Sequence, residues 1–358
     1  MRISWAGNPW SLFGLCFLNI LLIIITVGIY WFWARTEYRR YMWQMVRVNG
    51  EPLEYTGKGK ELFIGYLKLF FFVFLPVIVL ILGARFYFGP NHPVTIGVTL
   101  LIYLSFVFLY FAGVFRAHRY ILSRTRWRGI ALGLAGNAAG YAWKSIWTGL
   151  LISLTLGWIL PWRMMALRRK VTTAMHFGSV PFRFEGRAGP LYAPFAVLWL
   201  CFVGLYAAFI AIYVAAIQAS VQRGQPMPPQ GQVPLHWEDI PHSAVWIMIA
   251  IIPILLIGAC WLEARKLNLF ARATKIGGLD TDLQASGRSV LWLTVSNLFI
   301  LILSLGILRP ITQARRLHYL VTRMSFLGSA DLDEVLRGHE QEGSQGAGLE
   351  AAFAIEIF

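Results

Sequence analysis

Thr155-Leu-Gly157-Trp-Ile-Leu-Pro161-Trp162 closes a run of eighteen uncharged residues, 145–162. A basic segment follows at once, with Arg163, Arg168, Arg169 and Lys170. Glycine is a poor helix residue, and proline leaves a backbone carbonyl of the preceding turn without its donor. The stretch therefore predicts an apolar helix that breaks shortly before a positively charged surface.

The same order of residues occurs twice more, at 26–33 and 304–310. When Gly28, Gly157 and Gly306 are aligned, Asn or Thr stands nine positions earlier in every copy. We call each copy a glycine-motif helix. Its polar and helix-breaking residues are candidates for a transport pathway or for the helix break itself. These candidates are Asn19, Thr26, Gly28, Thr148, Thr155, Gly157, Pro161, Asn297, Ser304, Gly306 and Pro310. Of these, Asn19, Thr148 and Asn297 are expected to supply some of the hydrogen bonds that a broken backbone needs at membrane depth.

The composition is that of a membrane protein. Of the 358 residues, 57% are hydrophobic and 14% are charged, and the mean hydropathy is +0.59. Soluble domains carry about 25% charged residues. The apolar runs are continuous and long enough for transmembrane helices, whereas a membrane β-barrel would alternate apolar and polar residues. The fold class predicted is an all-α polytopic membrane protein.

The glycine-motif helices alternate with basic segments and with ordinary apolar spans. The spans lie at 62–84, 94–115, 191–220 and 243–262. The basic segments contain short β-hairpin patterns, of which the clearest is the alternation about Asn49-Gly50. Similar patterns occur at 125–129, 176–184, 273–283 and, more weakly, 324–332.

This order predicts an internal repeat of a glycine-motif helix plus two spans. The first repeat covers 1–140 and the second covers 141–288. A third glycine-motif helix with its basic segment covers 289–337, and an acidic tail at 338–358 is expected to be disordered.

The placement of Lys and Arg bears on whether the glycine-motif helices cross the membrane. If all seven apolar runs cross, the bases divide 18 against 13 between the two sides. If the glycine-motif helices enter and return on one face, or lie at the interface, 29 bases share a side and 2 lie opposite. Cytoplasmic loops carry an excess of Lys and Arg, so the returning arrangement is favoured. Straight spanning helices stay open as the alternative, which gives inverted repeats of the transporter type.

Catalytic and metal chemistry has little support in the sequence. The acidic residues lie in loops, at span ends or in the tail, and the histidines and the three cysteines show no metal-ligand spacing. We therefore expect no enzyme activity, no cofactor and no metal. The net charge of +15 is interleaved with apolar runs, so it is explained by topology and not by nucleic-acid binding.

Two functions are compatible with this pattern. One is a structural module that interacts with lipid or with a protein partner. The other is a transporter or channel with the glycine breaks along its pathway. In the first case, basic residues at one face would attract anionic lipid headgroups. The headgroup candidates are Arg39, Arg40, Arg126, Arg168, Arg169, Arg315 and Arg316.

The blocks Asn19-x6-Thr26-x-Gly28-Ile-Tyr-x-Phe-Trp and Glu54-Tyr-Thr-Gly-Lys-Gly-Lys-Glu-Leu-Phe63 carry a family resemblance. Together with Arg126-Trp-Arg-Gly129, they resemble the YjgN family of bacterial inner-membrane proteins. The third copy departs from the pattern, because Arg309 and Ile311 flank Pro310. The resemblance implies a multi-pass protein of the bacterial inner membrane and supplies no activity. With the charge placement, it predicts cytoplasmic basic segments and a cytoplasmic C-terminus.

Overall fold

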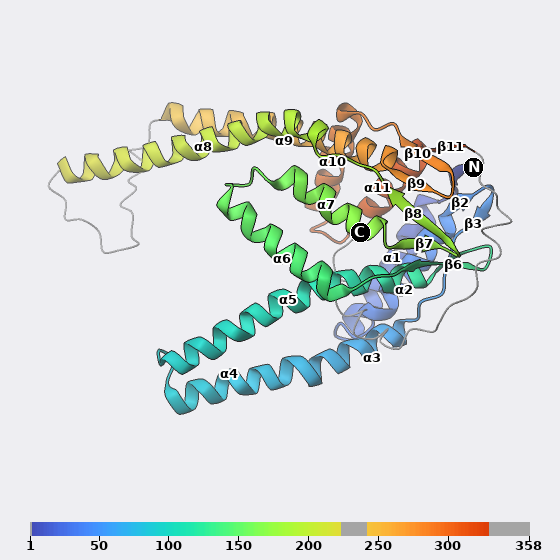
Figure 1. Cartoon of the computed structure of the whole chain (residues 1–358), viewed down its shortest axis with the longest axis horizontal. Coiled ribbons are helices and arrows are strands. Elements are labelled where there is room, and N and C mark those ends of the chain that lie inside the picture. The colour runs from blue at the N-terminus through green and yellow to red at the C-terminus, as the bar shows by residue number, and fades with distance from the viewer. Residues whose placement is uncertain (1, 223–241, 329–358) are drawn as a thin grey trace. The chain divides into compact units, whose positions relative to one another are not determined.

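The computed structural model describes residues 2–222 and 242–328 (Figure 1). The chain forms two compact units: residues 187–267 with 285–295 make the smaller one, and the other described residues make the larger one. This division is based on spatial contacts and not on sequence repeats, so it does not test the predicted repeat boundaries. The predicted tail at 338–358 and most of the loop at 221–242 lie outside the described residues.

Long apolar helices account for the predicted spans. In the larger unit, α3 (Gly59–Leu69), a π-helical segment η1 (Phe70–Phe74) and α4 (Leu75–Phe88) run as one rod, and α5 (Pro93–Ser123) follows. The smaller unit contains all of α8 (Gly189–Gln222) and most of α9 (His242–Arg272). Within the described residues, three helices are long and apolar enough to cross a membrane: Gly59–Phe88, Pro93–Ser123 and Gly189–Ala215. A fourth predicted span, 243–262, falls in α9, and part of its side-chain environment lies outside the description.

Local chemistry explains the shape of the first pair of spanning helices. Pro76 has no backbone N–H and its ring crowds the preceding turn, so the helix widens into η1 just before it. The loop between α4 and α5 turns at Gly89, which has a φ of 87°. Thr95 Oγ1 stabilises this loop by donating to the carbonyl oxygens of Ala84 (3.1 Å) and Gly89 (2.8 Å).

Each glycine-motif helix is a pair of helices joined by a five-residue turn, and we call each pair a glycine hairpin. The first consists of α1 (Pro9–Ile25) and α2 (Trp31–Met45), and the second of α6 (Ala138–Leu154) and α7 (Leu160–Thr172). The third consists of α10 (Gly287–Leu303) and α11 (Arg309–Arg323). The predicted break after Thr-x-Gly or Ser-x-Gly is therefore present in all three copies.

The short strands form two antiparallel sheets. A three-stranded sheet contains β1 (Ile3–Trp5), β2 (Val46–Val48) and β3 (Glu51–Pro52). An eight-stranded sheet runs in chain order from β4 to β11. Its strands are β4 (Glu54–Tyr55), β5 (Thr125–Trp127), β6 (Ile130–Leu134), β7 (Met175–Phe177), β8 (Val180–Phe184), β9 (Thr274–Ile276), β10 (Leu279–Leu283) and β11 (Met324–Leu327).

Four of the predicted β-hairpins are confirmed as β2–β3, β5–β6, β7–β8 and β9–β10. The described part of the fifth prediction, 324–332, forms β11, which pairs with β10. The residues from 329 onward lie outside the description. The joining of β5–β6, β7–β8 and β9–β10 into one sheet was not predicted.

The strands that flank each helical hairpin are neighbours in a sheet. Around the three glycine hairpins, Ile3 pairs with Val48, Leu132 with Phe177, and Asp280 with Leu327. The strands around the spanning helices pair in the same way, β4 with β5 and β8 with β9. Every helical hairpin therefore begins and ends at adjacent strands, so the chain returns to the same place after each one.

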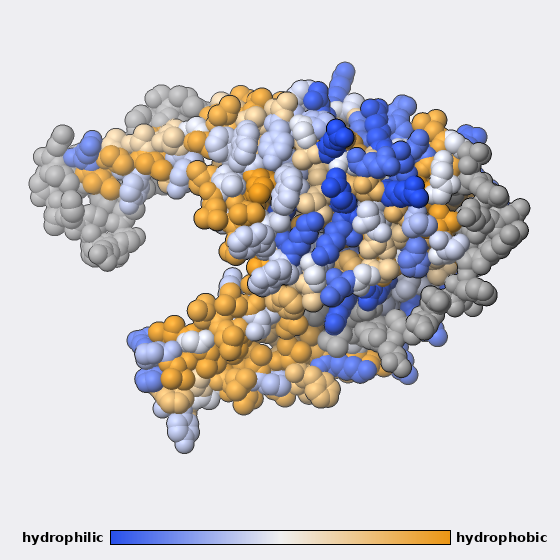
Figure 2. All heavy atoms as spheres, viewed as in Figure 1, coloured by the Kyte–Doolittle hydropathy of each residue, from blue (hydrophilic) through white to orange (hydrophobic). Residues whose placement is uncertain are grey.

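The larger sheet has one packed face and one exposed face, because side chains alternate along each strand. Trp127, Leu134, Phe184 and Leu283 are buried beneath the helices. Arg183, Lys275 and Asp280 are cross-strand neighbours on the opposite face. Figure 2 shows hydrophobic residues along α4 and α5, whereas hydrophilic residues gather toward the strands.

Glu51 and Arg128 form an ion pair between the turns of two β-hairpins, with Arg128 Nη2 2.9 Å from Glu51 Oε1. The guanidinium holds the pKa of the Glu51 carboxyl below its ordinary value. A lowered carboxyl pKa stabilises the fold at pH values above about 4.3, and that contribution is lost as the pH falls through the folded-state value. We expect Glu51→Gln to lower the melting temperature slightly at pH 7, and the difference to shrink as the pH falls below about 4.3. A gap between the two melting curves that does not shrink in acid would contradict this assignment.

Candidate functional site

The turns of the three glycine hairpins share one backbone geometry. Gly28, Gly157 and Gly306 have φ values of 89°, 87° and 82°. Each glycine N–H donates to the carbonyl five residues earlier, at 2.8, 2.7 and 2.8 Å. This bond and a second one from the preceding residue form a Schellman motif, which satisfies the last carbonyl groups of the first helix. Glycine suits this position because a side chain is strained at positive φ.

The hydroxyl group of the motif connects the two helices of each hairpin. Thr26 Oγ1 donates to the Leu22 carbonyl (2.7 Å) and accepts from the Tyr30 N–H (2.9 Å). Thr155 and Ser304 make the same pair of bonds in the other two hairpins. The side-chain hydrogen bonds at the break are made by Thr26, Thr155 and Ser304, whereas the sequence suggests Asn19, Thr148 and Asn297 for this role.

The tips of the glycine hairpins are exposed and apolar. Val27, Leu156 and Leu305 precede the three glycines, each with a φ of 49°, and they are 91%, 73% and 91% exposed. A Cβ built on Gly28 or Gly306 would meet nothing within 4 Å. A helix-packing role for these two glycines is therefore not supported, and an apolar side chain at each tip is left facing outward.

The polar residues nine positions before the glycines lie within the hairpins. Asn19 and Thr148 are buried, and Asn297 Oδ1 is a buried atom without a hydrogen-bond partner. Pro161 is fully buried near the start of α7. The Pro310 carbonyl accepts a bond of 2.8 Å from Tyr38 Oη, which joins the first and third hairpins. Asn19, Thr148 and Asn297 therefore occupy equivalent positions in the first helix of three separate hairpins.

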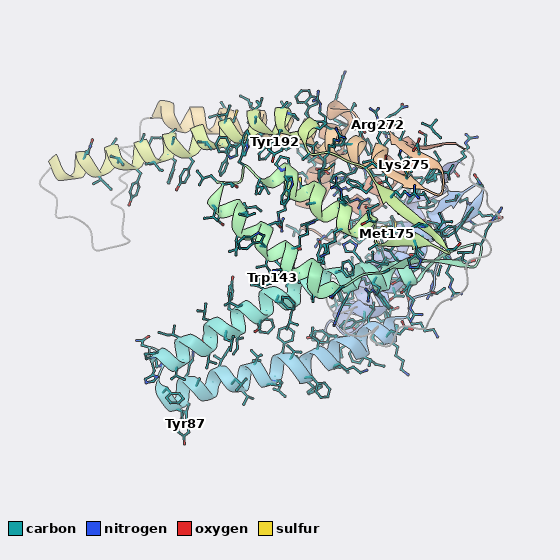
Figure 3. All side chains as sticks on the ribbon, viewed as in Figure 1. Tyr87, Trp143, Met175, Tyr192, Arg272 and Lys275 are labelled. Carbon is teal, nitrogen blue, oxygen red and sulfur yellow. The ribbon has the colours of Figure 1, made fainter. Side chains whose placement is uncertain are left out.

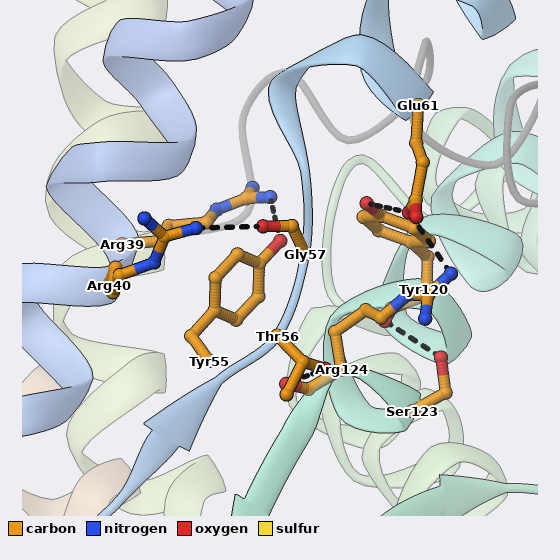
Figure 4. A network of polar contacts seen from close by, with 9 residues as sticks. All are labelled: Arg39, Arg40, Tyr55, Thr56, Gly57, Glu61, Tyr120, Ser123 and Arg124. Carbon is orange, nitrogen blue, oxygen red and sulfur yellow. Dashed lines mark hydrogen bonds and ion pairs between the residues drawn. The ribbon is translucent and has the colours of Figure 1, made fainter.

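The headgroup candidates differ in their surroundings. Arg39 is 6% exposed, and its Nη1 lies 3.4 Å from Tyr55 Oη. Figure 4 shows Arg39 beside Tyr55, and Arg40 Nη2 contacts the Gly57 carbonyl (3.4 Å). Arg39 therefore supports the fold, and we do not retain it as a headgroup ligand. The burial of Arg39 results from tertiary contacts, because the adjacent Arg40 has almost the same sequence neighbours and is exposed.

The other headgroup candidates carry charge near the helix ends and strands. Arg168, Arg169 and Arg316 are exposed, and Arg126 and Arg315 are half-buried. Arg169 Nη2 donates to the Gly186 carbonyl (2.6 Å), and Arg315 Nη2 contacts Ser296 Oγ (2.9 Å). These partners are neutral, so the bonds orient the guanidinium groups without cancelling their charge. Arg126 faces Glu54 across the β4–β5 ladder.

A second polar network joins the first spanning helices to the sheet. Glu61 Oε2 accepts from Tyr120 Oη and lies 3.0 Å from Arg124 Nη2 (Figure 4). Tyr120 is fully buried, so its hydroxyl needs such a partner. Among the described residues no group of three His, Cys, Asp or Glu side chains could hold a metal ion.

Comparison with known proteins gives the family of this chain. Residues 1–352 match the family described as "Bacterial protein of unknown function (DUF898)". The chain belongs to the DUF898 family. This DUF898 protein is 26% identical over 151 residues to inner membrane protein YjgN of Escherichia coli K12, which covers 42% of this chain and 35% of the relative. It is 37% identical over 68 residues to inner membrane protein YjgN of Salmonella typhimurium, covering 19% and 17%.

The matched segments thus span well under half the length of these curated relatives. No solved structure matches the chain. The resemblance to YjgN is confirmed, and the apolar helices agree with relatives that are named inner membrane proteins.

Sequence reasoning placed Arg163 and Lys170 in a basic segment but did not connect them with Lys144. Lys144 lies on α6, whereas Arg163 and Lys170 lie on α7 and reach across to α6. The only local signal is spacing: Gly140, Lys144 and Thr148 are four residues apart, and Arg163 and Lys170 are seven apart.

Proposed function

We propose that this DUF898 protein is a lipid-interacting scaffold of the inner membrane, with both sheets at the cytoplasmic face. In this arrangement α3–α5 and α8–α9 cross the bilayer, and the three glycine hairpins dip into the cytoplasmic leaflet and return. The pairing of the strands on either side of each glycine hairpin carries the proposal. A helix that crossed the membrane would separate those two strands by the thickness of the bilayer.

The dimensions of the second hairpin support shallow insertion. Arg163 contacts Thr148, so it lies level with a position six residues before the end of α6. Six helical residues rise about 9 Å, whereas the hydrocarbon core is about 30 Å thick. Only the apolar tip beyond Arg163 would then enter the hydrocarbon, as expected for an element that lies in the interface.

Aromatic side chains support the same placement. Trp143 and Trp147 on α6 are 67% and 58% exposed, and Tyr87 at the far end of α4 is 85% exposed (Figure 3). Trp and Tyr are enriched at the two membrane–water interfaces. Tyr87 would mark the periplasmic interface, and Trp143 would mark the cytoplasmic one.

The charge of the returning helices supports lipid contact. Neither α7 nor α11 contains Asp or Glu, and both carry exposed arginines. Basic residues near an anionic leaflet gain about 1 kcal/mol each. With the exposed apolar tips, each hairpin offers both groups that an interfacial element uses: apolar residues for the acyl chains and cations for the headgroups.

Topology reporters test the arrangement. We expect fusions after Gly50, Val180 and Lys275 to report the cytoplasm, and a fusion at Pro90 to report the periplasm. A periplasmic signal at Val180 or Lys275, with Gly50 cytoplasmic, would contradict the proposal. That result would favour the alternative function, a transporter with inverted repeats, in which the buried Asn19, Thr148 and Asn297 belong to a pathway.

A further inference from the structure

We propose that the seam of the second glycine hairpin is a binding site for the phosphate group of an anionic lipid, held by Lys144, Arg163 and Lys170. This site rests on the proposed function, since it needs the hairpin to lie in the headgroup layer. None of the three residues belongs to the headgroup set suggested by the sequence.

Two contacts show which residues of α6 lie opposite which residues of α7. Arg163 Nε donates to Thr148 Oγ1 at 3.2 Å. Lys170 Nζ donates to the Gly140 carbonyl, and a Cβ built on Gly140 would lie 3.1 Å from that nitrogen. These contacts place α6 and α7 antiparallel, with the face of α6 that contains Gly140 and Thr148 turned toward α7.

Lys144 lies between those two contacts on the same face. It is four residues from Gly140 and four from Thr148, and residues four apart share a helix face. Four residues rise about 6 Å, so Lys144 is within side-chain reach of both α7 cations. All three side chains are half-buried. Burial and the neighbouring Lys144 ammonium also lower the pKa of Lys170 from its ordinary value.

No carboxylate of the neighbouring elements neutralises this cluster. The sequences of α6 and α7 contain no Asp or Glu, and neither do α5, β6, β7 and β8, which pack nearby. Glu185, which follows β8, pairs with Lys275 at 2.8 Å. Within the described residues no ion pair reaches Lys144, Arg163 or Lys170, and the bonds they do make are to neutral oxygens.

The geometry suits a phosphate at the membrane surface. Three half-buried cations at one seam leave a strong positive potential, and a phosphate brings both negative charge and several acceptor oxygens. Trp143, next to Lys144, is exposed on the outside of the hairpin, at the level expected for headgroups (Figure 3). The exposed Leu154 and Leu156 above the seam would contact the acyl chains.

Lipid binding by the full chain, purified in an uncharged detergent and measured by native mass spectrometry, tests the site. We expect phosphatidylglycerol to bind more tightly than phosphatidylcholine. Replacing Lys144, Arg163 and Lys170 together with Gln should weaken phosphatidylglycerol binding by about 100-fold. The matched control replaces Arg2, Arg47 and Arg183 with Gln, which removes the same charge outside the hairpin, and should change binding by less than about threefold.

Lys144→Glu is the sharper variant, because it supplies a carboxylate to the seam. We expect it to abolish the preference for phosphatidylglycerol and to raise the melting temperature without lipid by about 2–4 °C. The Lys144 side chain makes no hydrogen bond within the described residues, and the backbone bond that its carbonyl accepts from Thr148 Oγ1 does not depend on the side chain, so this variant is expected to fold. A lowered melting temperature, or phosphatidylglycerol binding equal to that of the unmodified chain, would overturn the proposal.

Two further arms separate the possible sources of phosphate. Inorganic phosphate, added without lipid, should leave the melting temperature unchanged. If phosphate alone raised the melting temperature, and Lys144→Glu removed that effect, the ligand would be a soluble phosphate ester and the proposal of a lipid ligand would be overturned. Equal weakening by the hairpin and control triple variants would mean a diffuse charge effect and no site. These outcomes are independent of the topology fusions, so the site can fail while the scaffold arrangement stands.

Discussion

Alanine at Gly28, Gly157 and Gly306 is expected to destabilise the protein, by about 1–2 kcal/mol at each position. The backbone at all three has a φ above 80°, where any residue with a Cβ is strained. The three turns are separate from one another, so the losses should add to about 3–6 kcal/mol in the triple variant. Reversible unfolding of the detergent-purified protein by denaturant is the measurement.

The matched control uses two glycines inside the same apolar helices. Gly14 in α1 and Gly149 in α6 have open space around a built Cβ and no left-handed φ. Alanine there is expected to stabilise the protein by about 0.5–1 kcal/mol, because glycine in a helix interior is unfavourable relative to alanine. The same substitution therefore has opposite signs at the turn and in the helix.

The sign of the stability change at the three turn glycines distinguishes returning glycine hairpins from straight helices that cross the membrane. If the glycine-motif helices crossed the membrane as straight rods, Gly28, Gly157 and Gly306 would lie in helix interiors. Alanine would then stabilise all five positions. Stabilisation by Gly157→Ala comparable to that by Gly149→Ala would contradict the turns, and with them the proposed return to the cytoplasmic face.

The helix breaks were predictable because their cause is local. A hydroxyl residue two positions before glycine, within an apolar run, caps one helix and starts the next through bonds that span only four or five residues. The apolar spans were predictable for a similar reason, since length and composition decide them. Both signals survive without knowledge of any long-range contact.

The sheet was only partly predictable because its pairing is not local. Turn residues such as Asn49-Gly50 mark individual hairpins. However, β4 has two residues, and its partner β5 lies about seventy residues later in the chain. Strands this short contain no alternation that identifies a partner.

The candidate site divides in the same way. Arg39 and Arg40 are adjacent and chemically identical, yet one is buried against Tyr55 and the other is exposed. Only the position of β4 against α2 distinguishes them. Conversely, Lys144 looked like one more base of a basic segment, and its proximity to Lys170 follows from the return of α7 along α6.

Phe115→Ala is expected to give the largest loss of any single substitution considered, about 3–5 kcal/mol. Phe115 is 1% exposed and lies in a cluster that contains residues of α5, α6, α7 and β6. Its ring is 5.4 Å from that of Tyr141 on α6, and the Arg119 guanidinium lies 5.5 Å from the Phe115 ring. Removing it would open a cavity where the spanning helix, the second glycine hairpin and the sheet meet.

The control is Phe72→Ala in the first spanning rod, where the side chain is 80% exposed on an apolar surface. An exposed ring leaves no cavity, so we expect a change within about 0.5 kcal/mol. Because the Phe115 cluster holds α6 and α7 against α5, its loss should also weaken the lipid response assigned to Lys144, Arg163 and Lys170. Equal losses from Phe115→Ala and Phe72→Ala would show that the hairpin is not fixed by this cluster. The positions of Lys144, Arg163 and Lys170 would then depend on the contacts of α7 with the sheet alone.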